Sequence, residues 1–125
     1  LLQHYKADVQ RAGRLRIAAC QFPVNEDISE NANWIRKQMR TAKVNSADLV
    51  HFPECALSGY GGVDWKDSKQ LDWALLRQET RSIMRLAKEL KLWTLLGSSH
   101  QLSGNKKPHN SLYVINPHSR LSVLQ

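Results

Sequence analysis

Residues 48–64 read DLVHFPECALSGYGGVD, and this stretch decides the fold. Residues 48–53 are an apolar run that ends at a proline, which is typical of a buried strand. Residues 54–64 contain three glycines and therefore predict a loop with room for unusual backbone angles. Glu54 thus stands directly after the end of a buried strand.

Apolar patterns before this stretch predict a strand followed by a helix. Residues 15–22 (LRIAACQF) form a short apolar run bounded by Pro23 and Asn25, which is consistent with a buried strand. A helix is expected next, with Asn25 as its N-cap and with Glu26 and Asp27 where the helix dipole favours negative charge. Its single apolar stripe steps by three or four residues through Ile28, Ala32, Ile35, Met39 and Ala42.

After the loop, the pattern predicts a long helix over about residues 65–91 and a third strand over residues 92–97 (LWTLLG). Residues 103–109 have the composition of a turn, and residues 110–116 (NSLYVIN) predict a fourth strand, a hairpin partner of the third. The order β-α-β-α-β-β contains two crossover units, which require parallel strands with helices packed on the sheet. We therefore expect an α/β fold.

Length and composition narrow the class of protein. A chain of 125 residues with 42% hydrophobic and 23% charged residues fits one globular domain. Its apolar runs are far shorter than the roughly 20 residues of a membrane-spanning helix, and residues 1–16 lack the apolar centre of a signal peptide. Leucine stands first in place of methionine, so we expect a processed chain or a fragment. The two cysteines, Cys20 and Cys55, indicate buried thiols in a reducing compartment, the cytoplasm.

The net charge of +7 is spread toward the two ends of the chain. Residues 1–43 carry a net +4, residues 44–104 are neutral and residues 105–125 carry +3. A nucleic-acid surface concentrates its Lys and Arg on one face, so no nucleic-acid partner is predicted. The four-residue spacing of Arg77, Arg81 and Arg85 leaves one basic helical stripe as an alternative, although a solvated helix face is favoured.

Glu54 is the candidate catalytic residue. Ligands of open α/β sheets bind beyond the carboxyl ends of the strands, where Glu54 is expected to project beside a glycine-rich loop. A partly desolvated carboxylate at such a place is suited to act as a general base. Local capping or pairing of Glu54 is an equally good interpretation of the pattern alone.

Several motifs also resemble a known family. The segments RIAACQFPV (residues 16–24), DLVHFPECALSGY (48–60) and HNSLYVINPHSR (109–120), with the strand that enters Gly97, resemble the N-terminal half of a nitrilase-superfamily (carbon–nitrogen hydrolase) domain. The Pro-Glu segment is the specific part of this match. On this basis residues 1–14 are an N-terminal extension and residues 15–125 a truncated carbon–nitrogen hydrolase domain.

The resemblance implies a partial α-β-β-α sandwich and hydrolysis of a nonpeptide C–N bond in a small amide, nitrile or carbamoyl compound. Family chemistry uses a Glu-Lys-Cys triad and no metal or organic cofactor. The glutamate position falls on Glu54, whereas the lysine and the cysteine of the motif lie beyond Gln125. We therefore expect the isolated chain to be inactive and the complete form to be a homo-oligomer.

Other residues are weaker candidates for the missing triad members. Lys106 and Lys107 precede the fourth strand, so they are expected on a solvated hairpin loop. Cys55 is next to Glu54, yet adjacent strand-end residues tend to point to opposite sides, and a structural role is favoured. Cys20, within the first strand, is expected in the core. Tyr60 is assigned to the substrate pocket beside Glu54, with loop packing as the alternative.

Cofactor and metal sites are not indicated. The turn at Gly59-Tyr60-Gly61 resembles a dinucleotide-binding turn but has Asp64 in place of the third glycine. Neither the local group of His51, Glu54 and Cys55 nor the histidines at His100, His109 and His118 have metal-ligand spacing, and the latter are expected on separate strand ends and loops. The four tryptophans are expected to pack between helices and sheet.

A second function, from another class, is a noncatalytic interaction module. Such a module would pair with an intact copy through the sheet edge that a missing half leaves exposed. A half-sandwich would also leave one apolar sheet face uncovered, which predicts poor solubility and self-association. A basic nucleic-acid binder is the third and least favoured alternative.

Overall fold

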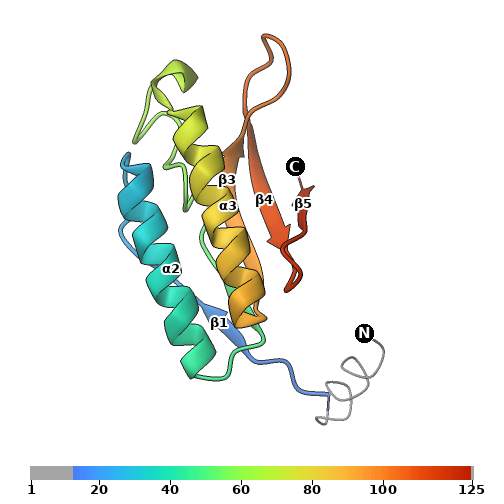
Figure 1. The fold of residues 1–125 in the computed structure, drawn as a ribbon. Helices are drawn as coiled ribbons and strands as arrows, with labels where there is room; N and C mark the ends of the chain where they lie inside the picture. Colours follow the sequence, from blue (N-terminus) through green and yellow to red (C-terminus); the bar gives the residue numbers. More distant parts are fainter. Residues whose placement is uncertain (1–12, 125) are drawn as a thin grey trace.

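The computed structural model describes residues 13–124, which form one layer of helices on one sheet (Figure 1). This layer pair is the α-β half of the expected α-β-β-α sandwich, and it confirms the α/β class. The expected N-terminal extension, residues 1–14, falls outside the described residues except for its last two. The elements are β1 (Ile17–Ala19), α2 (Ile28–Val44), β2 (Leu49–His51), the 3₁₀ helix η1 (Ser68–Gln70), α3 (Trp73–Leu90), β3 (Trp93–His100), β4 (His109–Ile115) and β5 (Leu121–Leu124).

The sheet has five strands in the order β1-β2-β3-β4-β5. The first three pair in parallel, as the two crossovers predict, with Val50 between Ala18 and Thr94. β3 and β4 form the expected antiparallel hairpin, in which Leu96 faces Tyr113. The fifth strand was not predicted, because only four residues pair with β4 after a turn at Asn116, too few for an alternating pattern to stand out.

Two helix boundaries differ from the sequence prediction. Asp27, not Asn25, is the N-cap of α2, because its Oδ1 accepts from the backbone N–H of Glu30 at 3.0 Å. Asn25 instead accepts from the backbone N–H of Asp27 at 2.7 Å, which is a turn one step earlier. The second helix begins at Trp73 rather than near residue 65.

Local capping explains the late start of α3. Asp67 and Gln70 form a capping box around η1, which closes that short helix on itself. Leu71 then adopts an extended backbone, with φ of −74° and ψ of 127°, so the helix cannot continue through it. Asp72 caps the new helix by accepting from the backbone N–H of Leu75 at 2.9 Å.

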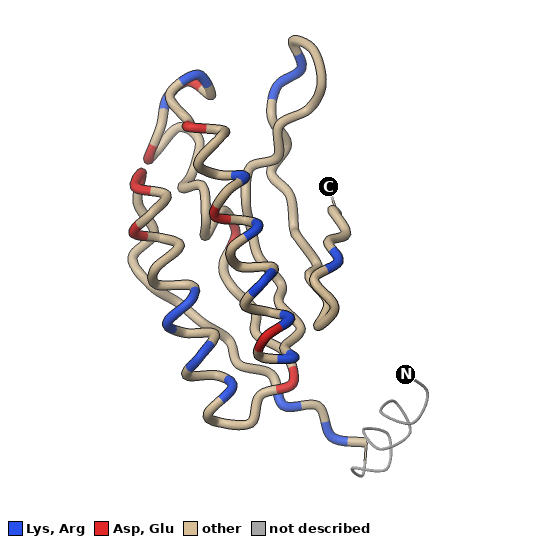
Figure 2. Tube along the Cα trace, viewed as in Figure 1, with Lys and Arg blue, Asp and Glu red and all other residues tan. Residues whose placement is uncertain are grey.

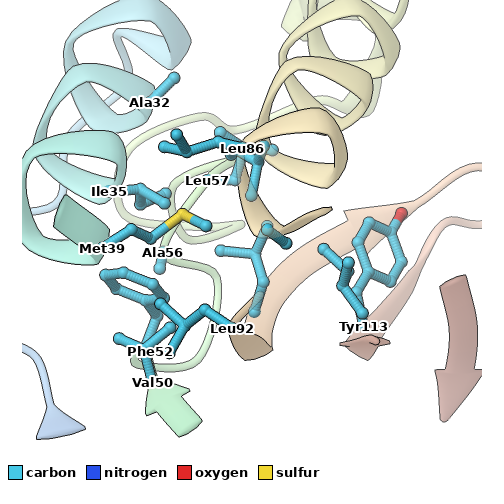
Figure 3. Packing of buried hydrophobic residues seen from close by; sticks show 14 of the residues in the cluster. Ala32, Ile35, Met39, Val50, Phe52, Ala56, Leu57, Leu86, Leu92 and Tyr113 are labelled. Atoms are coloured by element: carbon cyan, nitrogen blue, oxygen red, sulfur yellow. The ribbon is translucent and has the colours of Figure 1, made fainter. Parts of the chain in front are cut away.

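The hydrophobic core lies between the two helices and one face of the sheet (Figure 3). Alternating residues of the strands, among them Val50 and Leu96, are fully buried on this face. The predicted apolar stripe of α2 packs onto these strand residues, and α3 contributes a second apolar stripe. The largest fully buried apolar side chains are Phe52, Ile35, Met39, Leu57, Ile83, Leu92, Leu96, Ile115 and Val50.

The other face of the sheet carries apolar side chains that none of the described residues covers. Register places Ile17, Leu49 and Trp93 in one row across β1, β2 and β3. Ile17 is 55% exposed, Trp93 43% and Leu124 56%, so we name these three residues, with Leu49, the open face. The expectation that the first strand is buried is therefore wrong, because β1 is an edge strand with only one covered face. Cys20, expected in the core, is half-buried for the same reason.

Charged residues lie mostly along the solvent sides of the helices and in the loops (Figure 2). One ion pair joins the helices, between Arg36 of α2 and Glu79 of α3, and Arg36 also donates to Asn33 at 2.6 Å. Between residues 13 and 124, neither helix is long and apolar enough to cross a membrane.

Candidate active site

Glu54 follows β2 after Phe52 and Pro53, where the backbone of the chain crosses Gly97 of the neighbouring strand β3. The backbone N–H of Phe52 donates to the carbonyl of Leu95 at 2.9 Å, and that of Leu57 donates to Gly97 at 3.1 Å, so both ends of the crossing are tied to β3. Gly97 leaves the space: a Cβ there would lie 2.7 Å from Glu54 Cα and 2.6 Å from the Cys55 nitrogen. The backbone around Glu54 therefore rests on β3 and is held in a fixed place.

The loop after Glu54 is braced at several points. Gly59 has a φ of 73°, in the left-handed region, and its N–H donates to the carbonyl of Cys55 at 2.9 Å. Asp64 accepts from the backbone N–H of Tyr60 at 2.7 Å through its Oδ2. Asp64, which stands where a dinucleotide-binding turn has its third glycine, therefore closes this loop on itself.

Asn31 of α2 holds the same loop through hydrogen bonds of its side chain. Its side chain is fully buried; its Nδ2 donates to the carbonyls of Asn25 at 2.7 Å and Leu57 at 3.3 Å, and its Oδ1 accepts from the Asn25 N–H at 3.1 Å. The sequence analysis did not single out this residue. A polar residue beside Ile28, Ala32 and Ile35 on the apolar side of the helix was the available signal.

The side chain of Glu54 is held by Asn110, at the start of β4. Asn110 Nδ2 donates a hydrogen bond to Glu54 Oε1. The same amide accepts, through Oδ1, from the thiol of Cys55 at 3.5 Å. Asn110 therefore bridges Glu54 and Cys55, and the second carboxylate oxygen, Oε2, has no hydrogen-bond partner among the described residues.

Asn110 was missed by the sequence analysis. It precedes Leu112 and Val114 at alternate positions of β4, so it lies on the same side of the sheet as they do, the side of the open face. A polar side chain at the head of an otherwise apolar alternating row was the signal that could have indicated it. Its partner cannot be read from the pattern, because 56 residues separate Asn110 from Glu54.

Cys55 is buried beside Glu54, and its thiol is hydrogen-bonded to Asn110. Glu54 and Cys55 do not point to opposite sides as expected: Cys55 has a φ of 52°, which breaks the alternation of the strand, and both side chains reach Asn110. Burial first, and then the negative charge of Glu54, raises the pKa of the Cys55 thiol to about 11. A thiol of this kind holds almost no thiolate near pH 7, which favours the structural role.

Tyr60 is half-buried in the loop after Glu54. Burial first, followed by the charges of Glu54, Cys55 and Asp64, raises the pKa of its hydroxyl. The assignment of Tyr60 to a substrate pocket stays a prediction.

Glu54 itself is exposed within residues 13–124. The partial desolvation that was expected for it is therefore not found within this part of the chain. Glu54 lines neither the hollow between α3 and the antiparallel strands nor the hollow at the N-terminal ends of α2 and α3. The geometry supplies a carboxylate at the carboxyl end of a parallel strand, with one oxygen fixed and the other open to accept a proton.

A comparison with models of protein families identifies the family of the chain. The model of the family described as carbon–nitrogen hydrolase matches residues 16–124. The chain belongs to the carbon–nitrogen hydrolase family. The resemblance of this chain to the N-terminal half of a nitrilase-superfamily domain is thereby confirmed. A comparison of this hydrolase-family chain with curated proteins gives no match.

Solved structures agree with the fold of a carbon–nitrogen hydrolase. The chain superposes on the C. elegans NitFhit protein with a TM-score of 0.72 at 18% identity, covering 86% of this chain and 26% of that one. An amidase from Nesterenkonia sp. gives a TM-score of 0.71 at 17% identity, with 89% and 42% coverage. A glutamine-dependent NAD⁺ synthetase from Acinetobacter baumannii gives 0.64 at 24% identity, with 88% and 20% coverage. The carbon–nitrogen hydrolase chain thus spans less than half the length of each of these proteins.

The remaining candidates lie in the β3–β4 hairpin and in the turn before β5. Lys106 and Lys107 are exposed in the loop between β3 and β4, as expected for this hydrolase chain. His100 ends β3, His109 begins β4 and His118 lies in the turn before β5, on separate strand ends and a loop as expected. The register also pairs His100 with His109 across the β3–β4 hairpin. Across residues 13–124, no three His, Cys, Asp or Glu side chains are arranged to hold a metal ion.

Proposed function

We propose that this chain supplies the general base and the first sheet of a hydrolase that cleaves a nonpeptide C–N bond in a small amide, nitrile or carbamoyl compound. The observation that carries the proposal is the position of Glu54, fixed by Asn110 at the carboxyl end of a parallel strand in a carbon–nitrogen hydrolase fold. We place the domain at residues 15–125, in the cytoplasm, as part of a homo-oligomer.

The proposed chemistry divides between this chain and residues beyond it. A cysteine thiol gives its proton to Glu54 and its sulfur attacks the carbon of the amide or nitrile. A lysine stabilises the negative oxygen or nitrogen that develops there. From an amide, the nitrogen takes the proton back from Glu54 and leaves as ammonia or amine, which gives a thioester; from a nitrile, a first water adds to the thioimidate before ammonia leaves. A further water then cleaves the thioester to the acid. No metal or organic cofactor enters these steps.

Neither cysteine of this chain suits the role of the nucleophile. Cys55 has a pKa of about 11 and is hydrogen-bonded to Asn110, which positions the base. Burial also raises the pKa of Cys20, which follows the edge strand β1. We therefore propose that the 125-residue chain alone has no hydrolase activity.

The open face supports the proposal that further residues complete the domain. Its apolar rows lie on the same side of the sheet as Asn110, which holds Glu54. A second layer packed on these rows would cover both the apolar side chains and the carboxylate. Such a layer would exclude water from Glu54 and form the other wall of a substrate pocket.

The direct experiment is to read the coding DNA beyond the Gln125 codon and assay the encoded protein. We expect an in-frame continuation with a lysine and then a cysteine, and hydrolysis of small amides by the complete protein. Glu54→Gln should reduce kcat/KM by about 10³-fold or more. Glu89→Gln, an exposed change on α3, is the control. Full activity of a folded Glu54→Gln protein would contradict the assignment of the base.

A noncatalytic interaction module is the second candidate, favoured by the same open face. Ile17, Trp93 and Leu124 are large apolar residues in an exposed position, which is typical of a contact surface. Such a module should co-elute with an intact family member in gel filtration. Independent elution of the two proteins at micromolar concentration would argue against this role.

A further inference from the structure

A hollow of about 310 Å³ lies between α3 and the antiparallel strands at the far side of the sheet. Figure 1 shows the cause: the two helices cover the half of the sheet around β1 to β3, and β4 and β5 extend past α3. The volume is at the lower end of the range of small-molecule sites, about 300–1,000 Å³. The proposed hydrolase chemistry makes no use of this hollow.

The hollow and Glu54 are on opposite faces of the sheet. Tyr113 of β4 lines the hollow and faces the helices, whereas Asn110 of the same strand holds Glu54. Positions separated by three residues along a strand point to opposite faces. An inference about the hollow is therefore independent of the proposed catalytic role of Glu54.

Two arginines of α3 give the hollow its charge. Arg77 and Arg81 are four residues apart, so they lie on one side of the helix, and no carboxylate is among the lining residues. Arg77 Nη1 donates to Gln101 Oε1 at 3.0 Å, which holds this guanidinium against the end of β3. Arg81 makes no hydrogen bond or ion pair with residues 13–124. A pair of cations without a counter-charge complements an anion.

A third polar group stands opposite the arginines. His100 Nδ1 and the Tyr113 hydroxyl are 2.9 Å apart, and that hydroxyl donates to the carbonyl of Ser99 at 3.4 Å. This contact holds the ring of His100 at the edge of the hollow.

The remaining lining residues are in part polar, namely Thr80, Ser99 and Gln101, and in part apolar. Trp73 and Met84 from α3 and Leu121 from β5 contribute hydrocarbon surface to the hollow. An inorganic anion would leave this surface wet, whereas a ligand with an aromatic or aliphatic body would cover it. The planar fork of an arginine matches the two oxygens of a carboxylate.

We propose that this hollow binds a small organic carboxylate, with its head group on Arg81 and Arg77 and its apolar body against Trp73, Met84 and Leu121. The basic stripe of α3 is then neither a nucleic-acid surface nor only a solvated face. Arg85, the third arginine of the stripe, is not among the lining residues. This position makes it a matched control on the same helix.

The test is a titration of the chain with benzoate, followed by ¹⁵N–¹H NMR at constant ionic strength. Saturable shifts should map to α3, the end of β3 and β5. Arg81→Gln and Arg77→Gln should each weaken binding by about tenfold, whereas Arg85→Gln should change it less than twofold. Benzamide, which has the same shape without the charge, should bind about tenfold more weakly than benzoate.

Two results would overturn the proposal. Benzoate binding that Arg85→Gln weakens as much as Arg81→Gln would show general attraction to a basic helix. Inorganic phosphate that binds as tightly as benzoate and competes with it would show an anion site without use of the apolar wall. The spectra of the two arginine variants should retain the dispersion of the unmodified chain, which verifies that both are folded.

Discussion

Asn110 donates a hydrogen bond to Glu54 from a strand that begins more than fifty residues later in the chain. The bond joins the end of a parallel strand, β2, to the beginning of the antiparallel strand β4 across β3. It fixes one oxygen of the carboxylate and ties the segment after β2 to the β3–β4 hairpin. The side-chain oxygen of Asn110 also accepts a hydrogen bond from the thiol of Cys55.

The first prediction concerns this amide. In the complete hydrolase, Asn110→Ala should lower kcat/KM by roughly tenfold to a hundredfold, because Glu54 loses the donor that positions it. The main loss should be in kcat, with KM changed little. A purely structural defect would not affect kcat in preference to KM. Asn105→Ala, in the exposed loop between β3 and β4, is the control and should leave both constants unchanged. Equal losses in the two variants would argue against a positioning role.

The second prediction concerns the pH dependence of thiol modification. The pKa of Cys55 is raised from 9.0 to about 11, so at pH 8 its thiolate fraction should be about a hundredfold below that of an ordinary thiol. Its rate of alkylation by iodoacetamide, measured in a Cys20→Ala variant, should therefore be slow and rise about tenfold per pH unit up to pH 10. The unfolded chain is the control. Fast modification of folded protein at pH 7 would contradict the buried, protonated thiol.

The third prediction tests the close approach of the Glu54 backbone to β3. Gly97→Ala should lower the free energy of unfolding by roughly 1–3 kcal/mol, since the added Cβ meets the backbone of Glu54 and Cys55. Urea denaturation measures this change. Ser122→Ala, on the exposed strand β5, should alter the free energy of unfolding by less than about 0.5 kcal/mol. A Gly97→Ala protein as stable as the unmodified one would mean that the crossing is looser than described.

The fourth prediction concerns the open face. Trp93→Lys should reduce self-association of the 125-residue chain, because it places a charge in the row formed with Ile17 and Leu49. Sedimentation at several concentrations should show a larger monomer fraction. Lys66→Gln, in the exposed loop before η1, serves as a control for surface charge. Unchanged association of the Trp93→Lys chain would locate the contact elsewhere.

Local patterns predicted most of the elements. The three- and four-residue steps of α2, the apolar run of β3 and the proline after β2 are each determined by neighbouring residues, and each was confirmed. The errors lie where a competing local contact acts: Asp27 and Asp72 cap the helices, and the capping box of Asp67 delays α3. These contacts depend on which of several capping side chains meets a free N–H, which spacing alone does not decide.

The sequence by itself determined the α/β class, the parallel pairing and the place of Glu54 after a strand, because these follow from periodicity, chain length and turn residues. Only the tertiary structure decided that Asn110 holds Glu54, that Gly97 makes room for its backbone and that Arg77 and Arg81 border a hollow. The reason is physical: such contacts join segments far apart in the chain, so they depend on strand register and helix packing, which no local pattern records.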